Sequence, residues 1–188
     1  DPVEYILDGI NQVQMNPKAG LTFASGLRSI LRQDPDIIMV GEVRDKETAR
    51  LAIQAAMTGH LVFSTLHTNS AAGTIARLSD MGLESFLLAS SLAGIISQRL
   101  VRKLCPHCCR EYLLDEKIAV QLGIPEETGH MFYQAVGCNM CRQLGYIGRI
   151  AIHEVLVVGQ HLRSMIGHGD SIEGELEKAA IQEGMKSI

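Results

Sequence analysis

Residues 37–67 read IIMVGEVRDKETARLAIQAAMTGHLVFSTLH, and this stretch decides the fold. Residues 37–40 and 61–66 are runs of strand length that are largely apolar, which predicts strands covered on both faces. Between them, Asp45 is suited to cap a helix that buries one aliphatic face and ends at Gly59. A strand, a helix and a second strand within about 30 residues predict a βαβ unit, and hence a parallel sheet with a right-handed crossover.

Further elements are predicted on both sides of this unit. The helix before it ends at Asp34, because the residue before Pro35 is driven out of the α region. The helix that ends at residue 104 carries cations in its last turn, where the helix dipole favours them. The last helix is predicted to begin at Asp170 with Glu173 three residues on, a variant of the capping box. The predicted elements are helices over 22–33, 71–81, 85–104 and 170–184, a strand over 150–157, and extended runs over 3–7 and 10–15 around an Asp8-Gly9 hairpin turn.

The composition limits the classes of protein that fit. The chain has 188 residues, 46% of them hydrophobic, so it can bury a core; only 4% are aromatic, so aliphatic side chains must fill that core. The net charge of -4 is the opposite of the basic surface expected of a nucleic-acid binder. No apolar run reaches the roughly 18 to 20 residues of a membrane span, and the longest candidate, 86–97, is interrupted by Ser90, Ser91 and Gly94. The first residue is Asp1 and not Met, which predicts a piece of a longer protein.

Polar residues follow both predicted strands. Glu42 comes after the first strand and His67 after the second, so both are expected at the carboxyl edge of the parallel sheet, where such sheets bind ligands. His60 precedes its strand and should lie about 20 Å away, nearer the opposite edge, if six residues run extended. This geometry selects Glu42 and His67 as the reactive pair; two polar strand ends without function are the alternative.

The stretch 31–45 matches a family pattern at every specified position. It fits L-R-x-x-P-D-x-(three apolar)-G-E-(apolar)-R-D, which is typical of the ATPases of type II secretion and type IV pilus assembly. Residues 1–5 resemble the end of that family's acidic Asp box, 37–42 its Walker B strand and 58–69 its His box. The chain is similar to this family over nearly its whole length.

The resemblance implies an α/β fold with a RecA-like parallel sheet and flanking helices, working as a homo-hexameric ring that binds ATP and Mg²⁺. Glu42 would then be the Walker B acid that orients or deprotonates the attacking water, with Glu4 as a second acidic group near the metal. His67 would contact the γ-phosphate. Arg28, Arg32 and Arg77 match positions where the family has arginines. An arginine of this kind, at a ring interface, would stabilise charge on a neighbour's phosphate. For Arg32 and Arg77 the alternative is that they lie on solvated helix faces.

One expected part of an ATP site is missing from the sequence. No G-x-x-x-x-G-K-[ST] occurs in the 188 residues, so the phosphate-binding loop is expected upstream of Asp1 and this chain alone is expected to be inactive. The expected organisation is the C-terminal part of an ATPase core over 1–104, an insert over 105–149, and a return strand with C-terminal helices over 150–188.

All five cysteines fall in the insert. Cys105 with Cys108, and Cys138 with Cys141, form two C-x₂-C pairs, which predict a closed tetrahedral structural Zn²⁺ site. A redox pair and unpaired buried thiols are the other interpretations. Cys109 in place of Cys108, or His107 as a ligand, leaves the ligand set open, and the family resemblance favours the four C-x₂-C sulfurs.

The tetracysteine insert also indicates which branch of this ATPase family the chain resembles. Secretion and pilus-extension ATPases carry such an insert and the similar retraction ATPases lack it, so we expect a secretion or extension motor, peripheral on the cytoplasmic face of the inner membrane. Inner-membrane platform and assembly proteins are its expected partners, and no nucleic acid is expected. The competing hypotheses are a zinc-dependent nucleic-acid-binding module, with a local basic patch near the cysteines, and a purely protein-docking module.

Overall fold

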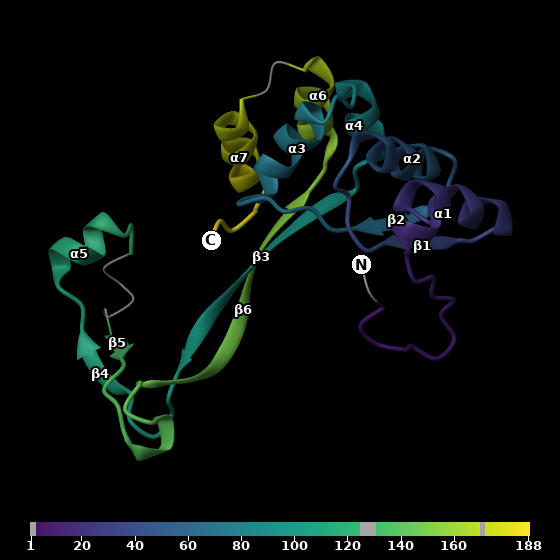
Figure 1. Ribbon diagram of the computed structural model, residues 1–188. Helices are drawn as coiled ribbons and strands as arrows, with labels where there is room; N and C mark the ends of the chain where they lie inside the picture. Colours follow the sequence, from purple (N-terminus) through teal and green to yellow (C-terminus); the bar gives the residue numbers. More distant parts are fainter. Residues whose placement is uncertain (1–2, 125–130, 170–171) are drawn as a thin grey trace. The chain divides into compact units, whose positions relative to one another are not determined.

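A computed structural model describes residues 3–124, 131–169 and 172–188 (Figure 1). The chain divides into two compact units. Unit 1 comprises Asp1–Ser97 and His153–Ile188, and unit 2 comprises Gln98–Ile152. Within the described residues, no helix is both long enough and apolar enough to cross a bilayer.

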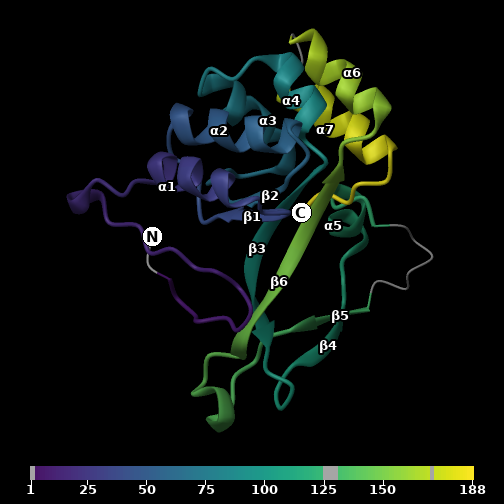
Figure 2. The ribbon, with the colours of Figure 1, turned by 90° about the vertical axis from the view of Figure 1, so that its right-hand side faces the viewer.

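Unit 1 contains the predicted βαβ arrangement (Figure 2). Strands β1 (Ile37–Val40) and β2 (Leu61–Ser64) pair in parallel, with Ile37 opposite Leu61. Helix α2 (Lys46–Met57) connects them, and the Asp45 side chain caps it by accepting a hydrogen bond from the Thr48 N–H at 2.8 Å. The parallel pairing and the Asp45 cap confirm the predicted βαβ unit over residues 37–67.

The prediction that both strands are covered on both faces is wrong in this structure. Along β1 burial alternates, so that Ile38 is 3% exposed while Met39 is 73% exposed. On β2 the side chains of Leu61 and Phe63 are also exposed, and the strand ends at Ser64, two residues before its predicted end. The physical reason is that α2 packs against the sheet on one face and α1 packs against α2, so only that face of β1 joins the core.

The predicted helices over 22–33, 71–81 and 170–184 correspond to helices close to those positions, whereas no helix was predicted over 160–168. Thr22 caps α1 (Phe23–Ile30) with a reciprocal capping box to Ser25, and the 3-10 helix η2 (Leu31–Gln33) ends at Asp34 in a left-handed conformation. The largest fully buried side chains of unit 1 are leucines from separate elements, so one core joins them. The other described elements are η1 (Pro17–Ala19), α3 (Ala71–Asp80), α4 (Ser85–Ser91), α6 (Gln160–His168) and α7 (Glu173–Gln182).

Two predictions near the ends of the chain had different outcomes. Asp8-Gly9 does form a turn, in which the Ile10 N–H donates to the Leu7 carbonyl at 3.3 Å, but the described residues 3–15 contain no strand. The expected hairpin is therefore wrong, because the turn lacks a ladder on either side. The expected helix cap at Asp170 lies outside the described residues.

The predicted helix over 85–104 is wrong. Helix α4 ends at Ser91, and the chain becomes strand β3 (Gly94–Leu104), which pairs with β6 (Tyr146–Val157). The Val158 N–H donates to the Ala93 carbonyl at 3.0 Å, and a Cβ on Gly94 would lie 3.1 Å from the Leu156 carbonyl oxygen. Pairing with a distant strand thus replaces the helix, and the basic residues of 99–103 lie on a strand and not at a helix end.

Unit 2 contains the cysteines and little core. Strands β4 (Arg110–Leu113) and β5 (Met131–Gln134) form an antiparallel pair, and α5 (Glu116–Gln121) follows β4. A short 3-10 helix, η4 (Asn139–Cys141), precedes β6. Most large apolar side chains of this unit are exposed.

Candidate active site and tetracysteine cluster

The ends of β1 and β2 are joined by hydrogen bonds around Glu42. The Thr65 hydroxyl donates to the Gly41 carbonyl at 2.6 Å, and the Val43 N–H donates to the Thr65 carbonyl at 3.0 Å. Glu42 lies between these two contacts and is 3% exposed. The main chain is therefore fixed on both sides of Glu42, at the carboxyl edge of the parallel pair.

Two cationic or titratable groups face this carboxylate. Arg44 Nη2 lies 2.5 Å from Oε1 of Glu42, and His67 Nε2 lies 3.5 Å from Oε2. The Arg44 guanidinium lowers the pKa of Glu42, against burial, which raises it; His67 adds a smaller lowering effect. Oε1 of Glu42 is buried, and its close contact is the ion pair with the Arg44 guanidinium.

The two histidines of the 58–69 stretch have different surroundings. His67 is 90% exposed in its side chain and lies beside Glu42, so the structure brings together the pair that the strand geometry selected. His60 Nδ1 instead lies 2.9 Å from the Ala55 carbonyl and 3.1 Å from the Thr58 hydroxyl, at the end of α2. His60 thus closes the last turn of α2 at the opposite end of β2.

The other candidate residues do not contact Glu42 in the described structure. Glu4 is exposed in an irregular segment, and Arg32 is exposed at the end of η2. Arg28 forms an exposed ion pair with Glu47. Arg77, in α3, lines a hollow of about 260 Å³ together with Thr68 and Asn69, the two residues after His67.

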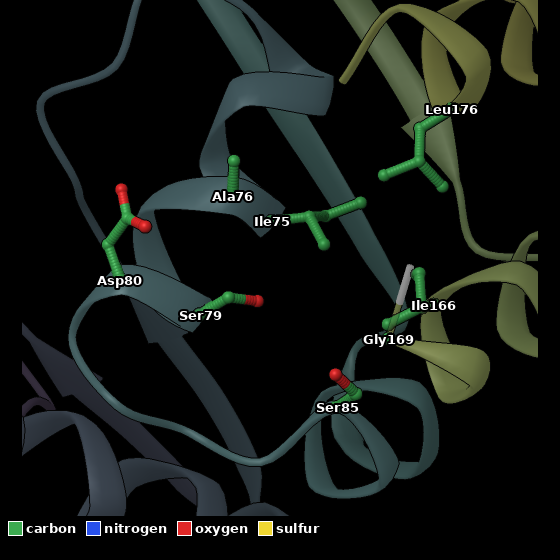
Figure 3. A pocket seen from close by; sticks show the side chains of 8 residues that line it. All are labelled: Ile75, Ala76, Ser79, Asp80, Ser85, Ile166, Gly169 and Leu176. Carbon is green, nitrogen blue, oxygen red and sulfur yellow. The ribbon is translucent and has the colours of Figure 1, made fainter. Parts of the chain in front are cut away.

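A second hollow, of about 180 Å³, lies among α3, α4, α6 and α7 (Figure 3). Figure 3 shows Ile75 and Leu176 pointing toward it, and Asp80 is the one charged side chain among the described residues that line it. It offers no cluster of titratable groups, so we place the candidate site at Glu42.

The sequence interpretation missed two parts of this site. Arg44 stood inside the matched pattern, two residues after Glu42, yet its contact with the carboxylate was not anticipated. Thr65 carried no signal beyond its place at the end of an apolar run, because its hydrogen bond to Gly41 depends on the register of two strands.

Four cysteine sulfurs in unit 2 form one cluster. The Sγ atoms of Cys105, Cys108, Cys138 and Cys141 all lie within 4.8 Å of one another, and three of the distances are 3.8 to 3.9 Å. A tetrahedron with Zn–S bonds of 2.3 Å has edges of about 3.8 Å, so this set fits zinc. Cys109 and His107 lie outside the cluster among the described residues.

Backbone groups also orient this cluster. The N–H groups of Cys138 and Gly145 each donate to Cys141 Sγ at 3.2 Å, and the Gly137 N–H donates to Cys108 Sγ at 3.3 Å. Burial opposes ionisation of Cys141, but these backbone donors outweigh it and lower its pKa to about 6. Burial raises the pKa of Cys108 to about 11, against the single donor from Gly137. Arg142 and Gln143 follow in left-handed conformations and turn the chain back past the cluster.

A parallel βαβ sheet with a buried acid and a histidine at its carboxyl edge, together with a tetracysteine cluster, defines an α/β protein with four cysteines arranged as metal ligands are. Comparison with known proteins identifies the family. The family model described as "Type II/IV secretion system protein" matches residues 1–188, and the chain belongs to this family.

Relatives and solved structures agree with this assignment. The chain is 54% identical over 184 residues to the type II secretion system protein E of Pseudomonas aeruginosa, covering 98% of this chain and 36% of the relative. It is 53% identical over 190 residues to the type IV pilus assembly ATPase PilB of Thermus thermophilus, covering 100% of this chain and 21% of the relative. The crystal structure of the pilus retraction motor PilT with bound ADP matches with a TM-score of 0.63 at 28% identity, over 100% of this chain and 48% of that one.

Proposed function

We propose that this chain is part of the ATP-hydrolysing motor of a bacterial type II secretion system or type IV pilus extension machine. The observation that carries the proposal is the Glu42 carboxylate, 3% exposed at the carboxyl end of a parallel strand, with His67 3.5 Å away. Relatives named as secretion protein E and as a pilus assembly ATPase support it. The chain spans 36% and 21% of these two relatives, so the activity belongs to a longer protein.

Glu42 acts on the attacking water in this proposal. Its pKa is lowered, so it is ionised at neutral pH and can accept a hydrogen bond from that water and then its proton. The Glu42 carboxylate, which Arg44 already pairs through Oε1, would also accept a hydrogen bond from a water molecule of the Mg²⁺ shell. Bound Mg²⁺ neutralises charge on the phosphates of ATP. His67, exposed beside Glu42, contacts the γ-phosphate.

Arginines and a second acid complete the proposed site. Arg77 lies in the hollow next to Thr68 and Asn69, which supports a place near the phosphate that His67 contacts. Arg28 is exposed and paired with Glu47, so it is free to meet a neighbouring subunit only when that ion pair exchanges. We assign Glu4 as a second acidic group near the metal. We also propose a homo-hexameric ring, in which an arginine of one subunit reaches the phosphate bound by its neighbour.

The four clustered cysteines hold a structural Zn²⁺ in this proposal. Sulfur separations of 3.8 to 3.9 Å and three backbone N–H donors support a tetrathiolate site. Zinc bound there would cross-link the segment after β3 to the segment before β6. Its role is to fold the insert, which we place over 105–149 between an ATPase portion, 1–104, and a return segment, 150–188.

The insert and the relatives favour secretion or pilus extension over retraction. Relatives named for secretion and for pilus assembly are 54% and 53% identical to this chain, whereas the retraction motor PilT is 28% identical. We therefore propose a cytoplasmic location, peripheral on the inner membrane, with membrane-embedded platform and assembly proteins as partners.

The test is Glu42→Gln in the full-length protein. Gln keeps the size of the side chain but cannot accept the proton, so steady-state hydrolysis should fall by about 10² to 10⁴ while ATP binding persists. His67→Ala should also lower turnover. His60→Ala is the matched control from the same stretch: it should lower the thermal midpoint by loosening the end of α2, with turnover per folded molecule retained.

Two results would contradict the proposal. Near-normal hydrolysis by Glu42→Gln would remove its catalytic role and leave Glu4 as the remaining acid. ATP turnover by the 188-residue chain alone, abolished by Glu42→Gln, would show that the missing phosphate loop is not needed.

A further inference from the structure

A buried carboxylate from the return strand meets the first turn of α3. Glu154, in β6, is 4% exposed, and its Oε1 accepts a hydrogen bond from the Ala71 N–H at 2.5 Å. Ala71 is the first residue of α3, so its N–H is one of the donors that a helix cannot satisfy internally. Ser70 satisfies another by accepting from the Gly73 N–H at 2.9 Å. A negative charge is also favoured at this end of the helix dipole.

The helix that Glu154 meets begins directly after the His67 segment. Residues 65–71 join β2 to α3, and both ends of this segment are fixed. At one end Thr65 bonds to the backbone on either side of Glu42, and at the other Ala71 bonds to Glu154. His67 therefore lies on a short span between two attachment points, one on the candidate acid's strand and one on β6.

Other contacts brace the second attachment point. The Thr68 hydroxyl lies 2.8 Å from the hydroxyl of Thr74, one turn into α3. The Ser70 hydroxyl donates to Glu173 of α7 at 2.7 Å. The exposed His67 side chain itself has few neighbours to hold it, so its place beside Glu42 depends on where this segment runs.

We propose that Glu154 is a positioning residue for the reaction at Glu42: by holding the start of α3, it sets the distance between His67 and the Glu42 carboxylate. The inference rests on the proposed function of His67. It predicts that the hydrogen-bond acceptor at position 154 matters, and not merely the packing there.

The test compares Glu154→Met with Glu154→Gln in the full-length protein. Met has a similar length and fills the same space but cannot accept the Ala71 hydrogen bond, whereas Gln can. A displaced catalytic group costs about 10²-fold per ångström, so Glu154→Met should lower kcat by about 10- to 100-fold with little change in the KM for ATP. Glu154→Gln should stay within about threefold of the parent kcat, because its carbonyl restores the bond.

A double-mutant cycle separates positioning from general destabilisation. If Glu154 acts through His67, adding Glu154→Met to His67→Ala should change kcat by less than about twofold. An equal effect in both backgrounds would overturn the proposal, as would a Gln variant as slow as the Met variant. Asp115→Ala, which removes the side-chain cap of α5 in unit 2, is the control and should leave kcat unchanged.

Amide hydrogen exchange at the start of α3 gives a readout that does not depend on activity. Glu154→Met should speed exchange of the Ala71 amide, and Glu154→Gln should not. A normal kcat for His67→Ala would defeat the role of His67, and this inference with it. A slow His67→Ala combined with a normal Glu154→Met would defeat the inference alone.

Discussion

Removal of zinc should unfold unit 2 and spare unit 1. Four of the described residues of unit 2 are buried, and two of them, Cys105 and Cys141, are proposed zinc ligands. A third, Gly145, donates to Cys141 Sγ, which leaves Ala119 as the buried aliphatic side chain. Burying its methyl group is worth about 0.8 kcal/mol, whereas binding of a structural zinc contributes about 10 to 16 kcal/mol at pH 7. The proposed metal would therefore outweigh the burial of this one aliphatic side chain by an order of magnitude.

The assay is amide hydrogen exchange on the full-length protein with and without a strong chelator, alongside metal analysis. We expect one zinc per chain before chelation, loss of protection in the described parts of 98–152 afterwards, and little change in α1 to α3. Cys141→Ser should lose the zinc and Cys109→Ser should keep it, since only the former lies in the cluster. Protein that contains no zinc, or protection in unit 2 that survives chelation, would refute the reasoning.

Two substitutions in unit 1 test the site and the core. Arg44→Ala removes the group that lowers the pKa of Glu42, so the acid limb of the kcat–pH profile should move to higher pH; an unmoved limb would show that Arg44 does not control this carboxyl group. Leu156→Ala, at a fully buried position of the return strand, should lower the free energy of unfolding by about 2 to 5 kcal/mol in urea titrations. Its exposed neighbour is the control: Val157→Ala should cost less than about 0.5 kcal/mol, and equal costs would contradict the assigned core.

The sequence predicted the local elements well and failed where distant strands pair. Residues 37–67 contain their own helix start and stop signals, Asp45 and Gly59, so the βαβ unit could be predicted without knowing the rest of the chain. The run 85–104 could not, because α4 stops where β6 pairs with β3, about 60 residues away in sequence. Gly94 was the available signal, because it permits the close approach of the Leu156 carbonyl.

The candidate site residues also divide into those that local sequence could predict and those that depend on distant contacts. The C-x₂-C spacing selected four sulfurs that the structure gathers, because each pair is local and the two pairs lie next to the ends of the paired strands β3 and β6. Glu42 and His67 could be paired from the parallel arrangement alone. Glu154 could not be found in this way, since its contact with Ala71 links residues 83 apart and depends on tertiary packing.

The burial of Glu42 follows from strand parity. Successive side chains of a strand point to opposite faces, and Ile38 and Val40 point into the core. Glu42 continues this alternation past the end of β1, so the register that buries two aliphatic side chains also buries a carboxylate. Burial alone would raise the pKa of Glu42, and the Arg44 guanidinium reverses that shift. The result is a carboxylate that stays ionised while shielded from solvent, so it is able to accept a hydrogen bond from a water molecule in the role proposed for it.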